Sequence, residues 1–191
     1  MRLNDQAEPL DGNGPAAGTL LVAHPSMEDP NFRRTVVFLT VHTKLEGSLG
    51  VVVNRPLGKR LKEYDPELAT SALADIPLYE GGPVAADKLI LAAWKWIEEE
   101  GTFRLYFGMD AEKTEKLLSD DPEFKVRGFM GHAGWSEGQL DAEIDQGDWV
   151  LSACLSELEN SEGEGVWRSI LCHENPAMRL LTDAPEDPSR N

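Results

Sequence analysis

Short runs of apolar and β-branched residues in the first part of the chain predict strands. Such runs cover residues 19–24, 35–42 and 49–53, and the last two, joined across Gly47, are expected to form an antiparallel hairpin. Asn54-Arg55-Pro56 is expected to end this hairpin in a loop, because a proline cannot continue a strand ladder. Further strands are expected over residues 76–79, 88–94, 103–107, 124–131 and 149–155.

Helical spacing of apolar residues is concentrated in the second half of the chain. Asp110 is a favourable N-cap for a helix over residues 111–119. Ser136 and Gln139 fit the capping-box pattern and predict a helix that ends near Gly147. In that helix Leu140 and Ile144 share the buried face, and Asp141, Glu143 and Asp145 are expected to face solvent.

A second capping-box pattern, at Ser161 and Glu164, predicts a helix close to the end of the chain. Its apolar face would consist of Val166, Trp167, Ile170 and Leu171. With strands clustered early and helices late, about seven strands and three to four helices predict an α+β fold with a largely antiparallel sheet.

The chain length favours one domain, because 191 residues are close to the usual size of a single globular unit. We expect this domain to span residues 18–182, between a disordered arm over 1–17 and an acidic disordered tail over 183–191. The arm lacks the apolar centre of a secretory signal, and no apolar run approaches the ~20 residues of a membrane span. The expected location is therefore cytoplasmic, with no membrane association.

The charge is strongly negative but unevenly distributed. There are 18 Lys and Arg against 34 Asp and Glu, a net charge of −16, which argues against nucleic-acid binding because phosphate repels an acidic protein. The acidic excess lies after residue 60, whereas residues 31–62 hold seven basic side chains and a single acidic one. These basic side chains either pair with the acidic remainder or form a local site for an anion.

Familiar catalytic patterns are missing from the sequence. There is no nucleophile elbow, phosphate-binding P-loop or dinucleotide-binding glycine motif. The four histidines, at positions 24, 42, 132 and 173, are not spaced as metal ligands, so no catalytic residue, metal or cofactor is predicted. The unusual features are loops rich in Gly, Pro and Asn: residues 54–56, 81–83 and 131–135, which either form tight turns or line a shared pocket.

Several segments together resemble the AlgH/YqgE family of small bacterial proteins, whose members are often described as transcriptional regulators without an established biochemical activity. The matching segments are residues 18–36 (GTLLVAHPSMEDPNFRRTV), 47–56 (GSLGVVVNRP), 81–84 (GGPV) and 134–149 (GWSEGQLDAEIDQGDW), with a weaker match at 166–171 (VWRSIL). The resemblance implies a single α+β domain whose strongly bent sheet folds toward a pseudo-barrel flanked by helices.

The resemblance also implies a set of recurring polar, aromatic and glycine positions, which we take as candidate ligand-binding residues. They are Pro25, Asp29, Phe32, Arg34, Asn54, Arg55, Pro56, Gly81, Gly82, Pro83, Gly134, Trp135, Gly138 and Gln139.

Three functions are compatible with the sequence. The first is a cytoplasmic ligand-binding or regulatory module without chemistry of its own, whose ligand is small and, given the basic stretch, a candidate anion. The second is a transcriptional regulator that acts through a protein partner or, ranked lower, through DNA. The third is a hydrolase or transferase that uses Asp29, His132 or Asn54 in a pocket formed by residues 25–34, 54–56, 81–83 and 132–139.

Overall fold

The computed structural model describes residues 14–43, 45–97, 102–153, 158 and 163–182. These residues contain nine strands in one sheet, with the order β4-β5-β8-β3-β2-β1-β9, while β6 pairs with both β7 and β8. The strands are β1 (Leu20–Ala23), β2 (Val36–Thr43), β3 (Gly47–Val52), β4 (Pro56–Arg60), β5 (Pro77–Glu80), β6 (Val84–Ile97), β7 (Thr102–Met109), β8 (Lys125–Trp135) and β9 (Trp149–Ser152).

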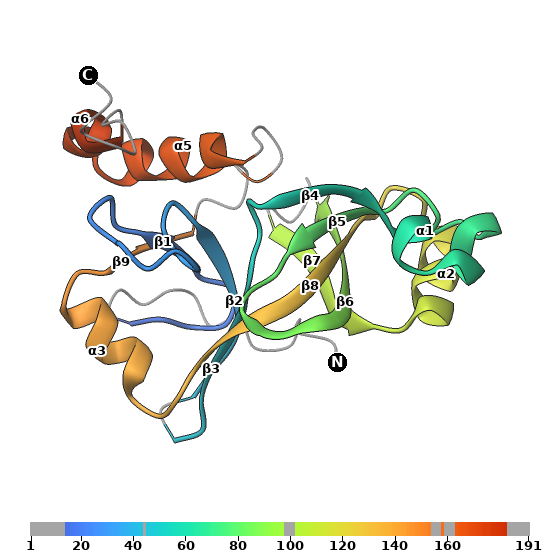
Figure 1. Cartoon of the computed structure of the whole chain (residues 1–191), viewed down its shortest axis with the longest axis horizontal. Helices are drawn as coiled ribbons and strands as arrows, with labels where there is room; N and C mark the ends of the chain where they lie inside the picture. Colours follow the sequence, from blue (N-terminus) through green and yellow to red (C-terminus); the bar gives the residue numbers. More distant parts are fainter. Residues whose placement is uncertain (1–13, 44, 98–101, 154–157, 159–162, 183–191) are drawn as a thin grey trace.

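The described part of the chain also contains five α-helices, more than the three to four expected, because two of them are single turns. They are α1 (Leu61–Tyr64), α2 (Ala111–Asp120), α3 (Gln139–Asp145), α5 (Glu164–Glu174) and α6 (Arg179–Thr182), with short 3₁₀ helices at Pro66–Thr70 and Pro176–Met178. Figure 1 shows α5 and α6 across one end of the molecule and α1 and α2 gathered at the other.

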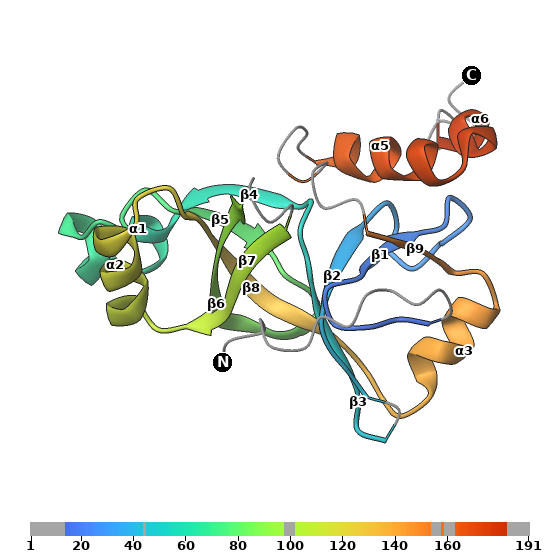
Figure 2. The same cartoon turned by 180° about the vertical axis from the view of Figure 1, so that it is seen from behind.

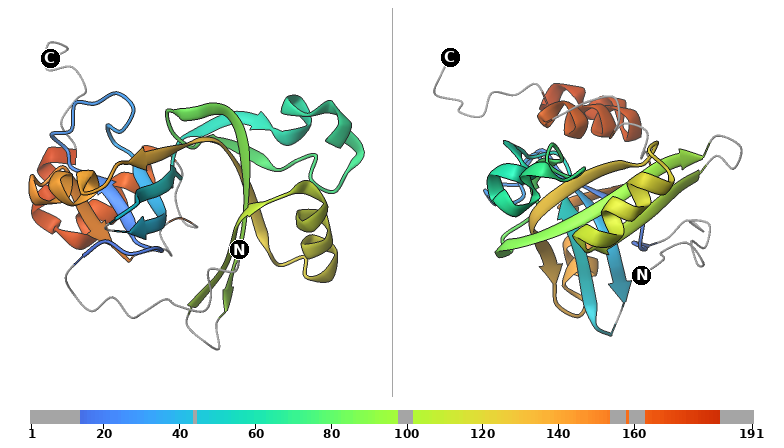
Figure 3. Two further views of the ribbon diagram at one scale, coloured as in Figure 1. Left: turned by 90° about the horizontal axis from the view of Figure 1, so that it is seen from below. Right: turned by 90° about the vertical axis from the view of Figure 1, so that its right-hand side faces the viewer.

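The sheet curls because the long strand β8 pairs with different strands along its length. The first part of β8 pairs with β5 in parallel and with β6 in antiparallel orientation, and its last part pairs with β3. Figure 3 shows the strongly curved path of β6 and β8. The fold is therefore α+β, with a predominantly antiparallel sheet curled into a half-barrel.

Both faces of β1 are buried, which explains its uninterrupted apolar sequence. Leu20 and Val22 belong to the core cluster that contains the apolar face of α5. Leu21 and Ala23 point the other way, into the cluster beneath α3. The view from behind in Figure 2 shows α5 and α3 on opposite sides of β1 and β9.

The strongest local signals are confirmed. Residues 36–52 form the expected antiparallel hairpin of β2 and β3. Asp110 caps α2, since its carboxylate accepts the Lys113 amide at 2.8 Å. The four residues of the predicted apolar face of α5 are all at most 2% exposed.

The expected extent of three segments is wrong. Strand β8 continues through residues 131–135, which were expected to form a loop, because Gly131 lets the strand pass close to Gly82 and Val84. The hairpin ends at Val52, ahead of Asn54-Arg55-Pro56 as expected, but Pro56 is not in a loop: it begins β4, where a proline is tolerated at the start of an edge strand. Helix α3 begins at Gln139 after Gly138, so Ser136 is not its N-cap, although the Gln139 side chain does accept the Ser136 amide at 3.1 Å.

The expected termini of the domain lie mainly outside the described residues. Of the predicted arm, residues 14–17 are described, and the Thr19 amide donates to the carbonyl of Ala16 at 3.0 Å. Residues 183–191, the predicted tail, and Ser161, the predicted cap of α5, lie outside the described residues. None of the helices in the described part is both long enough and apolar enough to cross a membrane.

Candidate functional site

Two of the predicted site segments, the loop at 25–34 and the segment at 54–56, meet at a cavity of about 370 Å³. We call it the arginine cavity, because three arginines from these segments line it. Two glutamates, one from the end of β5 and one from the first turn of α5, complete its charged wall. The lining residues are Pro30, Arg33, Arg34, Asn54, Arg55, Pro56, Glu80, Gly163 and Glu164.

Asn54 connects three segments at the arginine cavity through hydrogen bonds of its side chain. Its side chain is buried, at 3% exposure, and its Oδ1 accepts the Val36 amide at 2.8 Å. Its Nδ2 donates to the carbonyls of Arg34 and Gly163 at 3.0 and 3.1 Å. One amide group therefore joins β2, the 25–34 loop and the start of α5, a task that needs both a donor and an acceptor.

Arg55 also fixes the 25–34 loop, through hydrogen bonds from its guanidinium group. Its guanidinium donates to the carbonyls of Pro30, Asn31 and Arg33 at 3.0–3.1 Å, and also to Glu80 at 3.3 Å. A planar group with five N–H donors suits several carbonyls at once, which a lysine could not reach. The loop is thus held in one conformation around the cavity.

Arg34 combines backbone strain with a charged contact. Its φ of 56° lies in the left-handed region, which is costly for a residue with a Cβ. Its guanidinium donates to Glu164 at 2.8 Å and lies 5.6 Å from the ring centroid of Trp167. The strained backbone thereby places a cation between the α5 carboxylate and an aromatic ring, inside the cavity wall.

Sequence reasoning missed the two carboxylates of this cavity. Glu80 follows the strand predicted over residues 76–79 and was given no role, and Glu164 was considered only as part of a capping box. The Glu164 side chain instead reaches an arginine 130 residues away. No local sequence signal indicates a contact between residues so far apart. Pairing of the basic side chains of residues 31–62 with acidic residues was nevertheless one of the two alternatives that the sequence left open.

The glycines at 81 and 82 lie outside the arginine cavity, packed against β8. A Cβ on Gly81 would lie 2.2 Å from the carbonyl oxygen of Gly131, and one on Gly82 would lie 2.3 Å from the carbonyl carbon of His132. The backbone of Gly81 also joins two strands: its carbonyl accepts the Val52 amide, and its own amide donates to the carbonyl of Met130. We call this close backbone approach the glycine crossing; Pro83, which follows it, is exposed.

Phe32 and Trp135, both predicted site residues, meet in an aromatic cluster with Trp149 beneath α3. The three ring centroids are 5.6–5.9 Å apart. Glu143, which was expected to face solvent, is half-buried here: its Oε2 accepts the indole N–H groups of Trp135 and Trp149, each at 2.8 Å. That expectation is wrong because helical spacing does not reveal the two indole donors below the helix.

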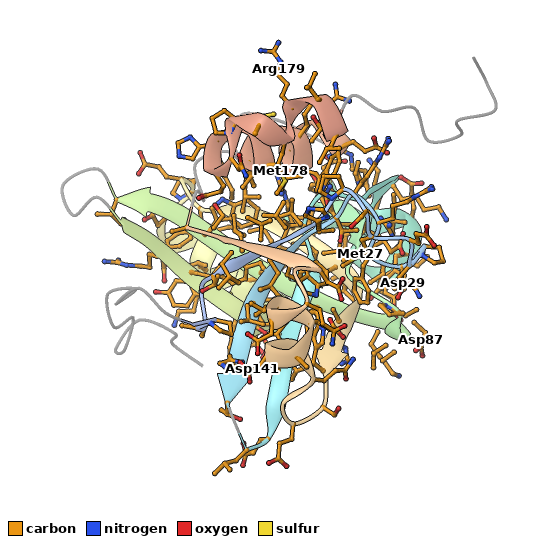
Figure 4. All side chains as sticks on the ribbon, turned by 90° about the vertical axis from the view of Figure 1, so that its left-hand side faces the viewer. Met27, Asp29, Asp87, Asp141, Met178 and Arg179 are labelled. Carbon is orange, nitrogen blue, oxygen red and sulfur yellow. The ribbon has the colours of Figure 1, made fainter. Side chains whose placement is uncertain are left out.

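The remaining predicted residues are spread around these features. Gln139 donates to Glu143 at 2.9 Å, Gly134 is exposed in β8, and Gly138 adopts a φ of 69° before α3. Pro25 is half-buried in the loop after β1. Asp29 is exposed, as Figure 4 shows, and its Oδ1 accepts the Asn31 amide at 2.8 Å, which caps a single helical turn.

The pocket assumed for a hydrolase or transferase is therefore not assembled as expected. The arginine cavity includes Asn54 but neither Asp29 nor His132 among its lining residues. Asn54 is already engaged in three hydrogen bonds within the fold. Among the described residues, no three His, Cys, Asp or Glu side chains gather as a metal site would require.

Comparison with known proteins matches nearly the whole domain. A family model described as AlgH-like matches residues 20–178. A UPF0301 protein from Thermobifida fusca is 37% identical over 191 residues, covering 91% of this chain and 94% of its own. A second UPF0301 protein, from Mycolicibacterium smegmatis, is 34% identical over 207 residues, covering 96% and 98%.

Two solved structures share the architecture. Protein DIP2367 from Corynebacterium diphtheriae superposes with a TM-score of 0.69 at 26% identity, covering 92% of this chain and 95% of that one. The AlgH protein from Pseudomonas aeruginosa superposes with a TM-score of 0.64, also at 26% identity, covering 93% and 100%. The curled α+β fold is therefore common to all three chains.

Proposed function

The chain belongs to the AlgH-like family, and we propose that it is a cytoplasmic binding module for a small anionic ligand held in the arginine cavity. The observation that carries the proposal is the gathering of Arg33, Arg34 and Arg55 around one cavity in a chain of net charge −16. Guanidinium groups bind carboxylates and phosphates through paired, charge-assisted hydrogen bonds.

Three features of the cavity support an anion over another ligand. The lining side chains include three arginines and two glutamates, so basic groups outnumber acidic ones in the wall of the cavity. The first turn of α5 lies at the cavity, and the amides of a helix N-terminus favour negative charge. The positive φ of Arg34 is energetically unfavourable, and strained backbone conformations of this kind are concentrated at functional sites.

Glu164 gives the proposal a distinctive consequence. Its carboxylate already occupies a position beside Arg34 that an anionic ligand would use, so ligand and side chain would compete. Replacing Glu164 with Gln removes the competing charge and keeps the shape. An anion should therefore bind more tightly to this variant, whereas a purely structural ion pair would leave affinity unchanged.

The test is isothermal titration of the full-length chain with inorganic phosphate and pyrophosphate. Arg33→Ala should weaken binding by about tenfold, the usual effect of losing one charge-assisted contact. Glu164→Gln should strengthen it. Arg179→Ala is the matched control, because Arg179 is an exposed arginine that points away from the body of the protein in Figure 4.

Two results would contradict the proposal. One is the absence of binding by any small anion at millimolar concentration. The other is an equal loss of affinity in Arg33→Ala and Arg179→Ala, which would mean that overall charge rather than the cavity attracts the ion.

A further inference from the structure

A second cavity, of about 450 Å³, lies beside the arginine cavity and has a different chemical character. We call it the apolar cavity. Leu78 and Met130 contribute from the neighbouring strands β5 and β8, and Leu57 and Tyr64 expose 40% and 45% of their surfaces at its mouth. Its lining residues are Leu57, Lys59, Glu63, Tyr64, Leu78, Glu80, Ala86 and Met130.

The apolar cavity has one fixed wall. The hydroxyl of Tyr64 donates to the carbonyl of Asp87 at 3.0 Å, which ties α1 to the first part of β6. Ala85, next to the lining residue Ala86, has a φ of 48°. Ala85 and Arg34 are the two residues other than glycine with positive φ in the described part of the chain, and each lies at or next to one of the two cavities.

Glu80 is common to both cavities and marks their boundary. Its carboxylate faces Arg55 of the arginine cavity at 3.3 Å, so its charge is balanced there. On the other side it lies beside Met130, its register partner across the parallel pair of β5 and β8. A ligand that extends past Glu80 would pass from guanidinium groups to apolar side chains.

We propose that the ligand is an amphiphilic anion, with a phosphate or carboxylate head on the arginines and a short apolar group in the second cavity. This inference rests on the proposed function, because the arginine cavity supplies the head-group site. The apolar side chains left partly exposed at Leu57 and Tyr64 are what such a group would cover. Burial of each methylene is favourable, so affinity should rise with the length of the apolar group.

The experiment is a titration series with methyl, butyl and octyl phosphate, each kept below its micelle concentration. Wild-type affinity should rise along the series, by up to about fourfold for each methylene that becomes fully buried. Leu57→Gln should flatten this rise. Leu180→Gln, which changes a leucine that is 85% exposed on α6, should not. Arg33→Ala should weaken all three ligands by a similar factor.

The outcomes separate the inference from the proposed function. If the three phosphates bind with equal affinity, or if Leu57→Gln leaves the rise intact, the apolar cavity does not take the chain and the inference is wrong while the anion site stands. If none of the phosphates binds, the proposed function fails and the inference fails with it. Thermal unfolding of each variant verifies that it is folded before its affinity is compared.

Discussion

The arginine cavity and the glycine crossing were both predicted from segments rich in Gly, Pro and Asn, yet opposite features of these segments shape the two regions. At the arginine cavity, the Asn54 side chain bonds to backbone groups of three separate segments: β2, the 25–34 loop and the start of α5. At the glycine crossing, it is the lack of a side chain that lets two strands approach. A loop rich in Gly, Pro and Asn therefore marks a constrained backbone, and only the neighbouring side chains decide whether a cavity forms there.

The largest expected effect is at the glycine crossing. Gly82→Ala would place a Cβ within 2.3 Å of β8, at a φ of 146°. Both the overlap and the backbone conformation are unfavourable, so the free energy of unfolding should fall by about 3 kcal/mol or more. Chemical denaturation with urea measures this change.

Gly134→Ala is the control for that measurement. Gly134 lies in the same region of the sheet, but a Cβ there would meet its nearest neighbours at 3.8–4.0 Å, which is ordinary contact. Its stability should stay close to that of the wild type. Equal losses in the two variants would mean that the close approach at Gly82 does not govern the stability of the crossing.

The next largest effect is expected at the arginine cavity. Asn54→Ala would leave the buried Val36 amide without its acceptor and two carbonyls without their donor. The expected loss in unfolding free energy is about 2–3 kcal/mol. Asn31→Ala, at an exposed asparagine of the neighbouring 25–34 loop, is the control and should change stability little. The Val36 amide should exchange its hydrogen much faster in Asn54→Ala than in the wild type or in Asn31→Ala. Such a result would show that the loss of stability arises at the hydrogen bond to Asn54.

A smaller effect is expected in the aromatic cluster beneath α3. Glu143→Gln keeps the size of the side chain but weakens the charge-assisted bonds from the indoles of Trp135 and Trp149. We expect a loss of about 1 kcal/mol and a change in tryptophan fluorescence. Asp145→Asn, at an exposed position on the same helix, should alter neither, and a matching change there would contradict the role given to Glu143.

The smallest effect is expected at an exposed ion pair outside both regions. The hydrogen bond from Lys62 lowers the pKa of Asp75 below its ordinary value of 3.8. Its contribution to stability is therefore present above the unfolded pKa and is lost as the pH falls through the lower folded pKa. Asp75→Asn should change stability at pH 7 less than Gly82→Ala, Asn54→Ala or Glu143→Gln, and an NMR titration should show the depressed pKa directly. An ordinary pKa for Asp75 would contradict this pairing.

Much of the fold could be predicted from the sequence, because its signals are local. The β2–β3 hairpin depends on two β-branched runs and a glycine between them, and α2 on a cap one residue before its start. Strand β8 was predicted too short, since Gly131 and Gly134 were assigned to a loop. In the structure Gly131 lies within the strand, at a point where the carbonyl oxygens of Gly82 and Val84 come too close for a Cβ.

The candidate site could be predicted only in part. Asn54, Arg55 and the 25–34 loop were correctly grouped as neighbours, and the structure brings them together. Glu80 and Glu164 were missed because their contacts join segments far apart along the chain. The glycine crossing was grouped with the site, since nothing in GGPV distinguishes a backbone that contacts a ligand from one that contacts another strand.

The position of β1 in the sheet has a consequence for how the chain folds as it is synthesised. One edge of β1 is paired by β2, which follows it almost at once, but its other edge is paired by β9. Trp167 then donates to the carbonyl of Ala23, 144 residues earlier. The apolar strand Leu20–Ala23 therefore remains half-covered until β9 and α5 have left the ribosome. Closure of this edge is expected to be a late and slow step, during which the nascent chain is most prone to aggregation.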